Sequence, residues 1–211
     1  GVIDKEEIVN DKGEYKEICR FANPFIQLRL YNALTTDLTG ERLPILALEP
    51  LDTLSDVFGS PEPDIPALLE RYKNYLKRLR AKRVNPWKDQ PRRSDLHYTE
   101  YVGHFHLYFW LRQAVGDICV VSPEFPTGNG RVDLHLKCES GQDVIEVKSF
   151  TSLPRLEKAK EQAAAYARKL NLPSITLAVF VPVEDENILN ELSRVHTIGQ
   201  VRVTVVAIGW V

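Results

Sequence analysis

Long apolar runs, a recognisable leader peptide and a regular spacing of cysteines are all missing from this sequence, and each absence narrows the class of protein. No apolar run approaches the ~20 residues that a membrane-spanning helix needs, and no signal peptide opens the chain. The three cysteines, Cys19, Cys119 and Cys138, lie far apart and match no zinc-binding spacing. Because an odd number of cysteines without an evident pairing suits a reducing compartment, we expect a cytoplasmic protein with no membrane partner.

Methionine and an ATP-binding loop are also absent. The chain has no methionine and begins Gly-Val-Ile, so we expect a processed product or a fragment of a longer protein. No segment matches Gly-x-x-x-x-Gly-Lys-Ser/Thr, the loop that holds nucleotide phosphates in many ATPases. Any ATP hydrolysis would therefore come from a segment outside this sequence.

Basic residues gather in residues 61–94, although the net charge of the whole chain is only −2. Ten basic residues lie between Arg71 and Arg93, against one acidic residue, Asp89. Apolar residues recur at helical spacing over 65–83, so we expect a basic helix followed by a loop. Such a cluster can follow a phosphate backbone, and a solvated helix face with a charged exit loop explains it equally well. The candidate contacts to nucleic acid are Arg78, Arg80, Lys82 and Arg83.

Residues 1–60 are expected to form a mainly helical N-terminal segment and a linker, the segment corresponding to the end of a preceding domain. Asn23-Pro24 is typical of a helix start, and that helix would run to about Leu34. Five prolines between positions 41 and 66 favour a linker after it.

Residues 95–211 alternate between helix and strand patterns and are expected to form one domain. The predicted order is a helix from Ser94 or Asp95 to Gln113, strands at 118–122, 130–137 and 143–149, a helix at 153–170, a strand at 175–181, a short helix near 185–194 and a last strand near 200–208. Two strands joined by a crossover helix run parallel, whereas short turns join antiparallel strands. The sequence therefore predicts an α/β fold with an α-β-β-β-α-β core, in which a mixed central sheet carries helices on both faces.

Two carboxylates and a lysine interrupt the predicted strands at Asp133, Glu146 and Lys148. Charged groups in half-buried strands are costly unless they are paired or bind a metal. Two carboxylates that meet on adjacent strands, with an ammonium two residues further on, would place a cation site beside a phosphate site. The alternative is a surface ion pair across two strands, worth a few tenths of a kcal/mol. Glu14-Tyr15-Lys16 is a second Glu-x-Lys, so this part of the pattern is not specific.

The arrangement resembles the restriction-endonuclease-like core of the PD-(D/E)XK nuclease superfamily, with Asp on the second core strand and Glu-x-Lys on the third. Four further elements extend the match: Gly-Arg-x-Asp-Leu at Gly130-Arg131-Val132-Asp133-Leu134, Gln-x-x-x-Tyr at Gln162 and Tyr166, a Glu before the Gly-Arg turn at Glu124, and an acidic residue on the first core helix at Glu100. The similarity covers residues 95–181. It is closest to the nuclease-like domain at the C-terminal end of prokaryotic AAA-ATPase-like proteins, whose upstream segment often carries an Asn-Pro like Asn23-Pro24.

The resemblance implies a metal site formed by oxygen ligands. Asp133 and Glu146 would bind Mg²⁺ through carboxylate oxygens, and the carbonyl of Val147 would add a third oxygen. Glu100 would complete the site or hold a second ion. Mn²⁺ is expected to substitute for Mg²⁺.

The resemblance also implies catalytic and substrate-binding roles for residues around the metal. Together with Asp133 and Glu146, the catalytic set comprises Lys148, which would orient the nucleophile or stabilise charge on the phosphate, and Gln162. Gln162 and Tyr166 lie one helical turn apart, so they would hydrogen-bond Lys148 or the substrate backbone. Tyr166 and Arg131 are further candidate contacts to nucleic acid.

Each of the helix residues has a structural alternative. Gln162 fits a partly exposed helix former, and Tyr166 fits core packing with a satisfied hydroxyl. Glu100 fits a first-turn residue that the helix dipole favours.

The leading functional hypothesis is a Mg²⁺-dependent nuclease that hydrolyses DNA phosphodiester bonds, with RNA as an alternative substrate. A second hypothesis is a catalytically inactive nucleic-acid-binding module with the same fold. A third is a regulatory domain attached to an ATPase domain on the same native chain. A homodimer is compatible with all three.

Overall fold

The chain divides at Pro44 and Ile45 into two units, residues 1–44 and 45–211, in the computed structural model. The residues that the structure describes are 3–9, 15–21, 46–49, 52–59, 63–88, 90, 92, 98–126, 131–139 and 141–210. Among these, none of the helices has the length and apolar character needed to cross a membrane.

The described part of the first unit is a pair of antiparallel strands, β1 (Ile3–Val9) and β2 (Tyr15–Phe21). The sequence analysis expected a mainly helical segment and missed both strands. β1 contains Ile3, Ile8 and Val9, and β2 contains Tyr15, Ile18 and Phe21. Such β-branched and aromatic residues favour strands even where charged residues separate them. The helix predicted from Asn23-Pro24 lies outside the described residues.

The second unit is built on a six-stranded sheet with the order β3-β4-β5-β6-β8-β7. Its strands are β3 (Cys119–Pro126), β4 (Arg131–Cys138), β5 (Gly141–Ser149), β6 (Ser174–Val181), β7 (Val195–Ile198) and β8 (Val201–Gly209). β3, β4 and β5 are antiparallel neighbours, whereas β5 and β8 run parallel to β6. The predicted mixed sheet and its α/β order are confirmed. β7 was not predicted, because four residues are too few to display an alternation.

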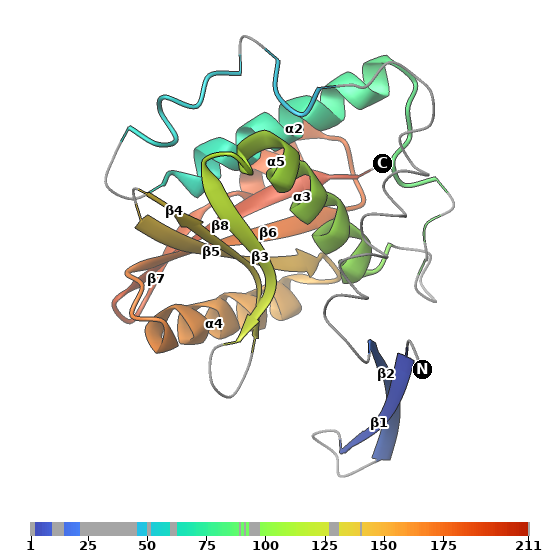
Figure 1. Ribbon diagram of the computed structural model, residues 1–211. Coiled ribbons are helices and arrows are strands. Elements are labelled where there is room, and N and C mark those ends of the chain that lie inside the picture. The colour runs from blue at the N-terminus through green and yellow to red at the C-terminus, as the bar shows by residue number, and fades with distance from the viewer. Residues whose placement is uncertain are drawn as a thin grey trace. The chain divides into compact units, whose positions relative to one another are not determined.

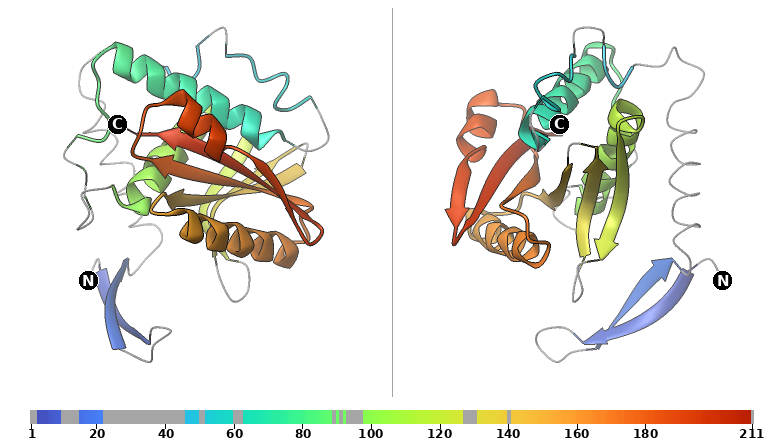
Figure 2. Two further views of the ribbon diagram at one scale, coloured as in Figure 1. Left: turned by 180° about the vertical axis from the view of Figure 1, so that it is seen from behind. Right: turned by 60° about the vertical axis from the view of Figure 1, so that its left-hand side comes forward.

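Four helices of the described residues pack on this sheet. They are α2 (Ile65–Ala81), α3 (Glu100–Val115), α4 (Leu153–Lys169) and α5 (Glu186–Leu192). α2 and α3 cover one face and α4 covers the other (Figures 1 and 2). α4 packs through Ala159, Ala163 and Ala167 on alternate apolar residues of β6 and β8, as its apolar spacing predicts. α3 begins at Glu100, later than the predicted start at Ser94 or Asp95.

α2, predicted as a basic helix in residues 61–94, belongs to the same compact unit as the sheet. Tyr72 is fully buried and packs against Trp110 of α3 and Phe180 of β6, with ring centroids 5.2 and 6.3 Å away. Its hydroxyl lies 2.6 Å from Nδ1 of His106. Burial lowers the pKa of His106 to about 3, so the ring is neutral and its Nδ1 can accept a hydrogen bond from the Tyr72 hydroxyl. Trp110 Nε1 donates to the Ala47 carbonyl at 3.0 Å and ties the preceding segment to the same core.

Cys119 and Cys138 form a disulfide, which corrects the expectation that the cysteines do not pair. They lie directly opposite each other in the register of β3 and β4. The 19-residue separation concealed this pairing, because the hairpin folds one cysteine back onto the other. This disulfide removes the basis for expecting a reducing compartment, which was that the cysteines are unpaired.

Replacing Gly103 with alanine is expected to destabilise the protein. A Cβ at Gly103 would come 2.6 to 2.9 Å from ring atoms of Phe180, which is itself packed against Trp87 and Trp210. An unobstructed Gly→Ala change in a helix stabilises by ~1 kcal/mol, whereas overpacking here should cost about 1–3 kcal/mol. Urea denaturation would measure the change, with the exposed Gln113→Ala on the same helix as control. A more stable Gly103→Ala variant would contradict the close packing of α3 on β6.

Candidate active site around Lys148

Asp133 lies just beyond the last paired rung of β4 and β5, which is Leu134↔Ile145. Its Oδ2 accepts a hydrogen bond from the Val147 amide at 2.7 Å. Its backbone carbonyl accepts a hydrogen bond from Nε2 of His104, on α3, at 3.0 Å. Asp133 is therefore held through both its side chain and its backbone, while its side chain stays 24% exposed.

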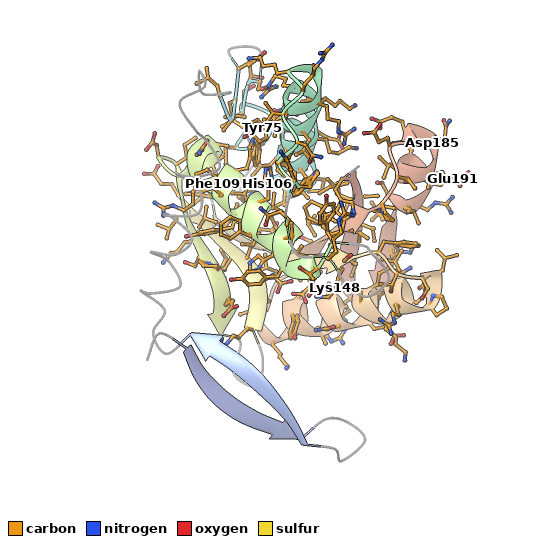
Figure 3. All side chains as sticks on the ribbon, turned by 90° about the vertical axis from the view of Figure 1, so that its right-hand side faces the viewer. Tyr75, His106, Phe109, Lys148, Asp185 and Glu191 are labelled. Carbon is orange, nitrogen blue, oxygen red and sulfur yellow. A yellow bond between two sulfur atoms is a disulfide. The ribbon has the colours of Figure 1, made fainter. Side chains whose placement is uncertain are left out.

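Lys148 gathers three carboxylates around its ammonium group. Nζ donates to Glu146 Oε1 at 2.9 Å and to Glu100 Oε1 at 3.2 Å, and it lies 3.6 Å from Asp133 Oδ2. It also donates to the carbonyl of Val147 at 2.9 Å. Glu146 and Lys148 are two residues apart on β5 and project from one face, and Glu100 is the first residue of α3. Lys148 lies between this end of α3 and α4 (Figure 3). The structure thus brings together the three acidic residues and the lysine that the sequence analysis selected.

Burial shifts the titration of these groups. Glu146 is 2% exposed, and burial, reinforced by the charge of Asp133, raises its pKa from 4.5 to about 7. Burial also raises the pKa of Glu100. Burial alone would lower the pKa of Lys148, but the charges of Asp133, Glu146 and Glu100 outweigh it, so that this pKa lies above its usual value. One ammonium is set against three carboxylates, and the excess negative charge favours a further cation.

One buried carboxylate oxygen has no hydrogen-bond partner among the described residues. Oε2 of Glu146 is buried and unpaired, which is costly for a charged group unless something binds it. The oxygens of Asp133, Glu146 and Val147 are hard ligands of the kind that Mg²⁺ prefers. These residues fit a divalent cation, although within the described ranges no three His, Cys, Asp or Glu residues are already arranged to hold one. Lys148 contacts the same oxygens, so a cation would share them with the ammonium or displace it.

Gln162 and Lys148 line one cleft of about 240 Å³ between α3 and α4. The α4 side of this cleft also holds Arg155 and Lys158. Gln162 Nε2 donates to the hydroxyl of Tyr166 at 2.9 Å, rather than to the lysine. Gln162 and Tyr166 therefore share one helix face, as predicted, but this hydrogen bond joins them to each other and not to Lys148, which was a predicted partner.

Arg78 and Arg80, the two basic candidates that lie on α2, are engaged within the protein. Arg78 lies 2.7 Å from Asp52 Oδ2 and donates to the Ala47 carbonyl at 3.0 Å. Arg80 lies 3.3 Å from Glu184 and donates to a carbonyl of β8 at 2.8 Å. Lys82 and Arg83 are exposed just past the end of the helix.

Arg131, the remaining basic candidate, pairs with Glu124 at 2.9 Å at the end of the β3–β4 hairpin where the two strands connect. Its side chain is 55% exposed. Glu124 is thereby placed with Arg131 rather than among the groups around Lys148.

Sequence reasoning missed His104, Arg155 and Lys158. His104 lies one turn after Glu100 on α3, so helical spacing could have placed both on the side that faces β4. Arg155 and Lys158 lie one turn apart near the start of α4. Two isolated cations are a weak signal in the sequence beside the ten basic residues between Arg71 and Arg93.

Comparison with protein-family models, with curated proteins and with solved structures finds no match for this chain.

The stability of the metal-free protein should fall as pH rises, because of Glu146. With a folded-state pKa of about 7 against an ordinary 4.5, folding favours the protonated form, and this contribution is lost as pH rises through 7. The loss between pH 5 and pH 8 should be on the order of 1–3 kcal/mol. Glu146→Gln removes the titrating group, so its stability should fall less over the same range.

Denaturation at several pH values in EDTA would measure this difference. Glu139→Gln, on the exposed turn after β4, is the matched control and should follow the wild type. Parallel curves for the wild type and Glu146→Gln would contradict the raised pKa.

Proposed function

We propose that this protein is a Mg²⁺-dependent nuclease that hydrolyses DNA phosphodiester bonds at the site around Lys148. The observation that carries this proposal is the convergence of Glu100, Asp133 and Glu146 on one ammonium, with a buried Glu146 oxygen unpaired. Such an arrangement attracts a divalent cation, since a single lysine cannot neutralise three carboxylates. The same residues stand in the order that resembles the PD-(D/E)XK nucleases.

Asp133, Glu146 and the carbonyl of Val147 would hold Mg²⁺, or Mn²⁺ in its place, with Glu100 at the edge of the site. When bound, the ion would polarise the scissile phosphate and lower the pKa of its water. The hydrogen bonds from the Val147 amide and from His104 keep Asp133 oriented toward β5. Lys148 would orient the nucleophile or stabilise charge that develops on the phosphate oxygens.

The dimensions of the cleft suit a polymer backbone. Its volume of about 240 Å³ is below the ~300–1,000 Å³ typical of pockets that enclose a small molecule. Arg155 and Lys158 lie along its α4 side, so anionic groups are favoured there. A phosphodiester chain that crosses the cleft would place one phosphate beside Glu100 and Lys148, next to Asp133 and Glu146, while the rest of the chain stays in solvent.

Plasmid nicking in Mg²⁺ or Mn²⁺ tests the proposal. The wild type should convert supercoiled DNA to nicked and linear forms, and EDTA should abolish this. Asp133→Asn and Lys148→Ala should each lower the rate by roughly 10²-fold or more, because each removes a group that acts on the reacting phosphate or its metal. Asp117→Asn, an exposed carboxyl after α3, is the matched control and should cleave like the wild type.

Cleavage that survives both substitutions would rule out this site. Salt-dependent DNA binding by the wild type, without metal-dependent cleavage, would favour the alternative of a catalytically inactive nucleic-acid-binding domain.

A further inference from the structure

Helix α4 carries a row of hydrogen-bond donors along one flank. Arg155, Lys158, Gln162, Tyr166 and Lys169 follow one another at spacings of three and four residues. At 3.6 residues per turn this confines them to a stripe roughly 80° wide. We call these five residues the α4 donor stripe.

The other exposed flank of α4 has a different character. Glu157 and Glu161 lie there, and Glu157 pairs with the buried Lys160 at 2.7 Å. Arg168 is also on that flank, because it lies about 100° around the helix from its neighbour Lys169. α4 therefore separates a flank of donors from a flank that contains its exposed carboxylates.

One end of the donor stripe reaches the candidate active site. Arg155, Lys158 and Gln162 line the same cleft as Lys148 and Glu100. A phosphate chain that enters the cleft therefore meets the two cations of α4 beside the group proposed to act on the scissile phosphate.

The rest of the stripe continues without a break toward the end of α4. Gln162 donates to the Tyr166 hydroxyl at 2.9 Å, and the Lys169 ammonium lies 5.6 Å from the centroid of the Tyr166 ring, within cation–π range. From Arg155 to Lys169 the stripe is ~20 Å long at 1.5 Å per residue. That length corresponds to about six nucleotides at 3.4 Å per step of one strand.

The cations of α2 are less suited to this role. Arg78 is paired with Asp52 at 2.7 Å, and Lys77 is paired with Glu186 at 2.8 Å. A phosphate that replaced such a partner would leave the carboxylate without its cation, so the net gain in binding free energy would be small. On α4, by contrast, Lys160 is the cation paired with a carboxylate among the described residues. Lys160 lies outside the donor stripe.

We propose that the α4 donor stripe is a track for a phosphodiester backbone, which leads one nucleic-acid strand away from the site around Lys148. This inference rests on the proposed function and specifies its substrate-binding surface. Contacts to phosphates carry no base information, so the track binds without regard to sequence. In this proposal α4 contacts the nucleic acid, in place of the basic cluster at 71–93 from which the sequence predicted the contact.

Salt-dependent binding of the full chain in EDTA tests the track without cleavage. Fluorescein-labelled single-stranded and duplex DNA of random sequence would serve as probes. The slope of log K against log salt changes by ~0.7 per phosphate contact for a single strand and by ~0.9 for a duplex. The Arg155→Gln/Lys158→Gln variant should therefore reduce the slope by about 1.4 with the single strand and about 1.8 with the duplex. Lys169→Gln should reduce it by about 0.7 with the single strand and about 0.9 with the duplex.

Arg168→Gln is the matched control, because it removes the same charge from the adjacent residue on the other flank. Its slope should equal that of the wild type, and glutamine preserves helix propensity at each position. A Lys77→Gln variant on α2, where the ammonium is paired with Glu186, should likewise leave the slope unchanged.

Unchanged slopes for the stripe variants, with the wild type still binding, would overturn the track and leave the nuclease proposal standing. A slope lowered equally by Arg168→Gln and Lys169→Gln would also overturn it, because general charge would then explain binding. The expected slope changes in a protein that cleaves no DNA would support the track while the nuclease proposal fails.

Discussion

The ammonium of Lys148 is the group on which the arrangement of the site depends. It contacts Glu100 from α3, Asp133 from β4 and Glu146 from its own strand, so three elements meet at one cation. Without it, mutual repulsion and burial would disfavour the ionised carboxylates. Even with it, Glu146 has a raised pKa and an unpaired oxygen. Lys148 therefore offsets part of the negative charge of the three carboxylates. The negative charge that remains favours the binding of a metal ion.

The fold brings these groups together through two features of ordinary packing. The β4–β5 ladder ends at Leu134↔Ile145, which leaves the Asp133 side chain to accept the Val147 amide. α3 lies close on β6 because Gly103 has no Cβ to strike Phe180. The same helix then supplies Glu100 to Lys148 and His104 to the Asp133 carbonyl. Strand register and helix approach together bring charged groups from α3, β4 and β5 to one ammonium.

Much of the sheet and its carboxylates could be predicted from the sequence, because β6 is continuously apolar and charges in strands such as Asp133 and Glu146 stand out. Features that depend on register or on distant partners could not. The disulfide required knowing that Cys119 faces Cys138 across a hairpin. The basic cluster looked free in the sequence, yet Arg78 is neutralised by Asp52, 26 residues away, and Arg80 by Glu184. The donor stripe of α4 was overlooked because its cations are few and spaced by whole turns.

A crystal structure of the protein soaked in Mn²⁺ tests the central claim most directly. The account predicts anomalous density between Asp133 and Glu146, within about 2.1 Å of their carboxylate oxygens, with Glu146 Oε2 now bound and Lys148 drawn away from it. Carboxylates that turn apart, or a Lys148 that keeps all its contacts while no metal density appears, would contradict a metal site at Asp133 and Glu146.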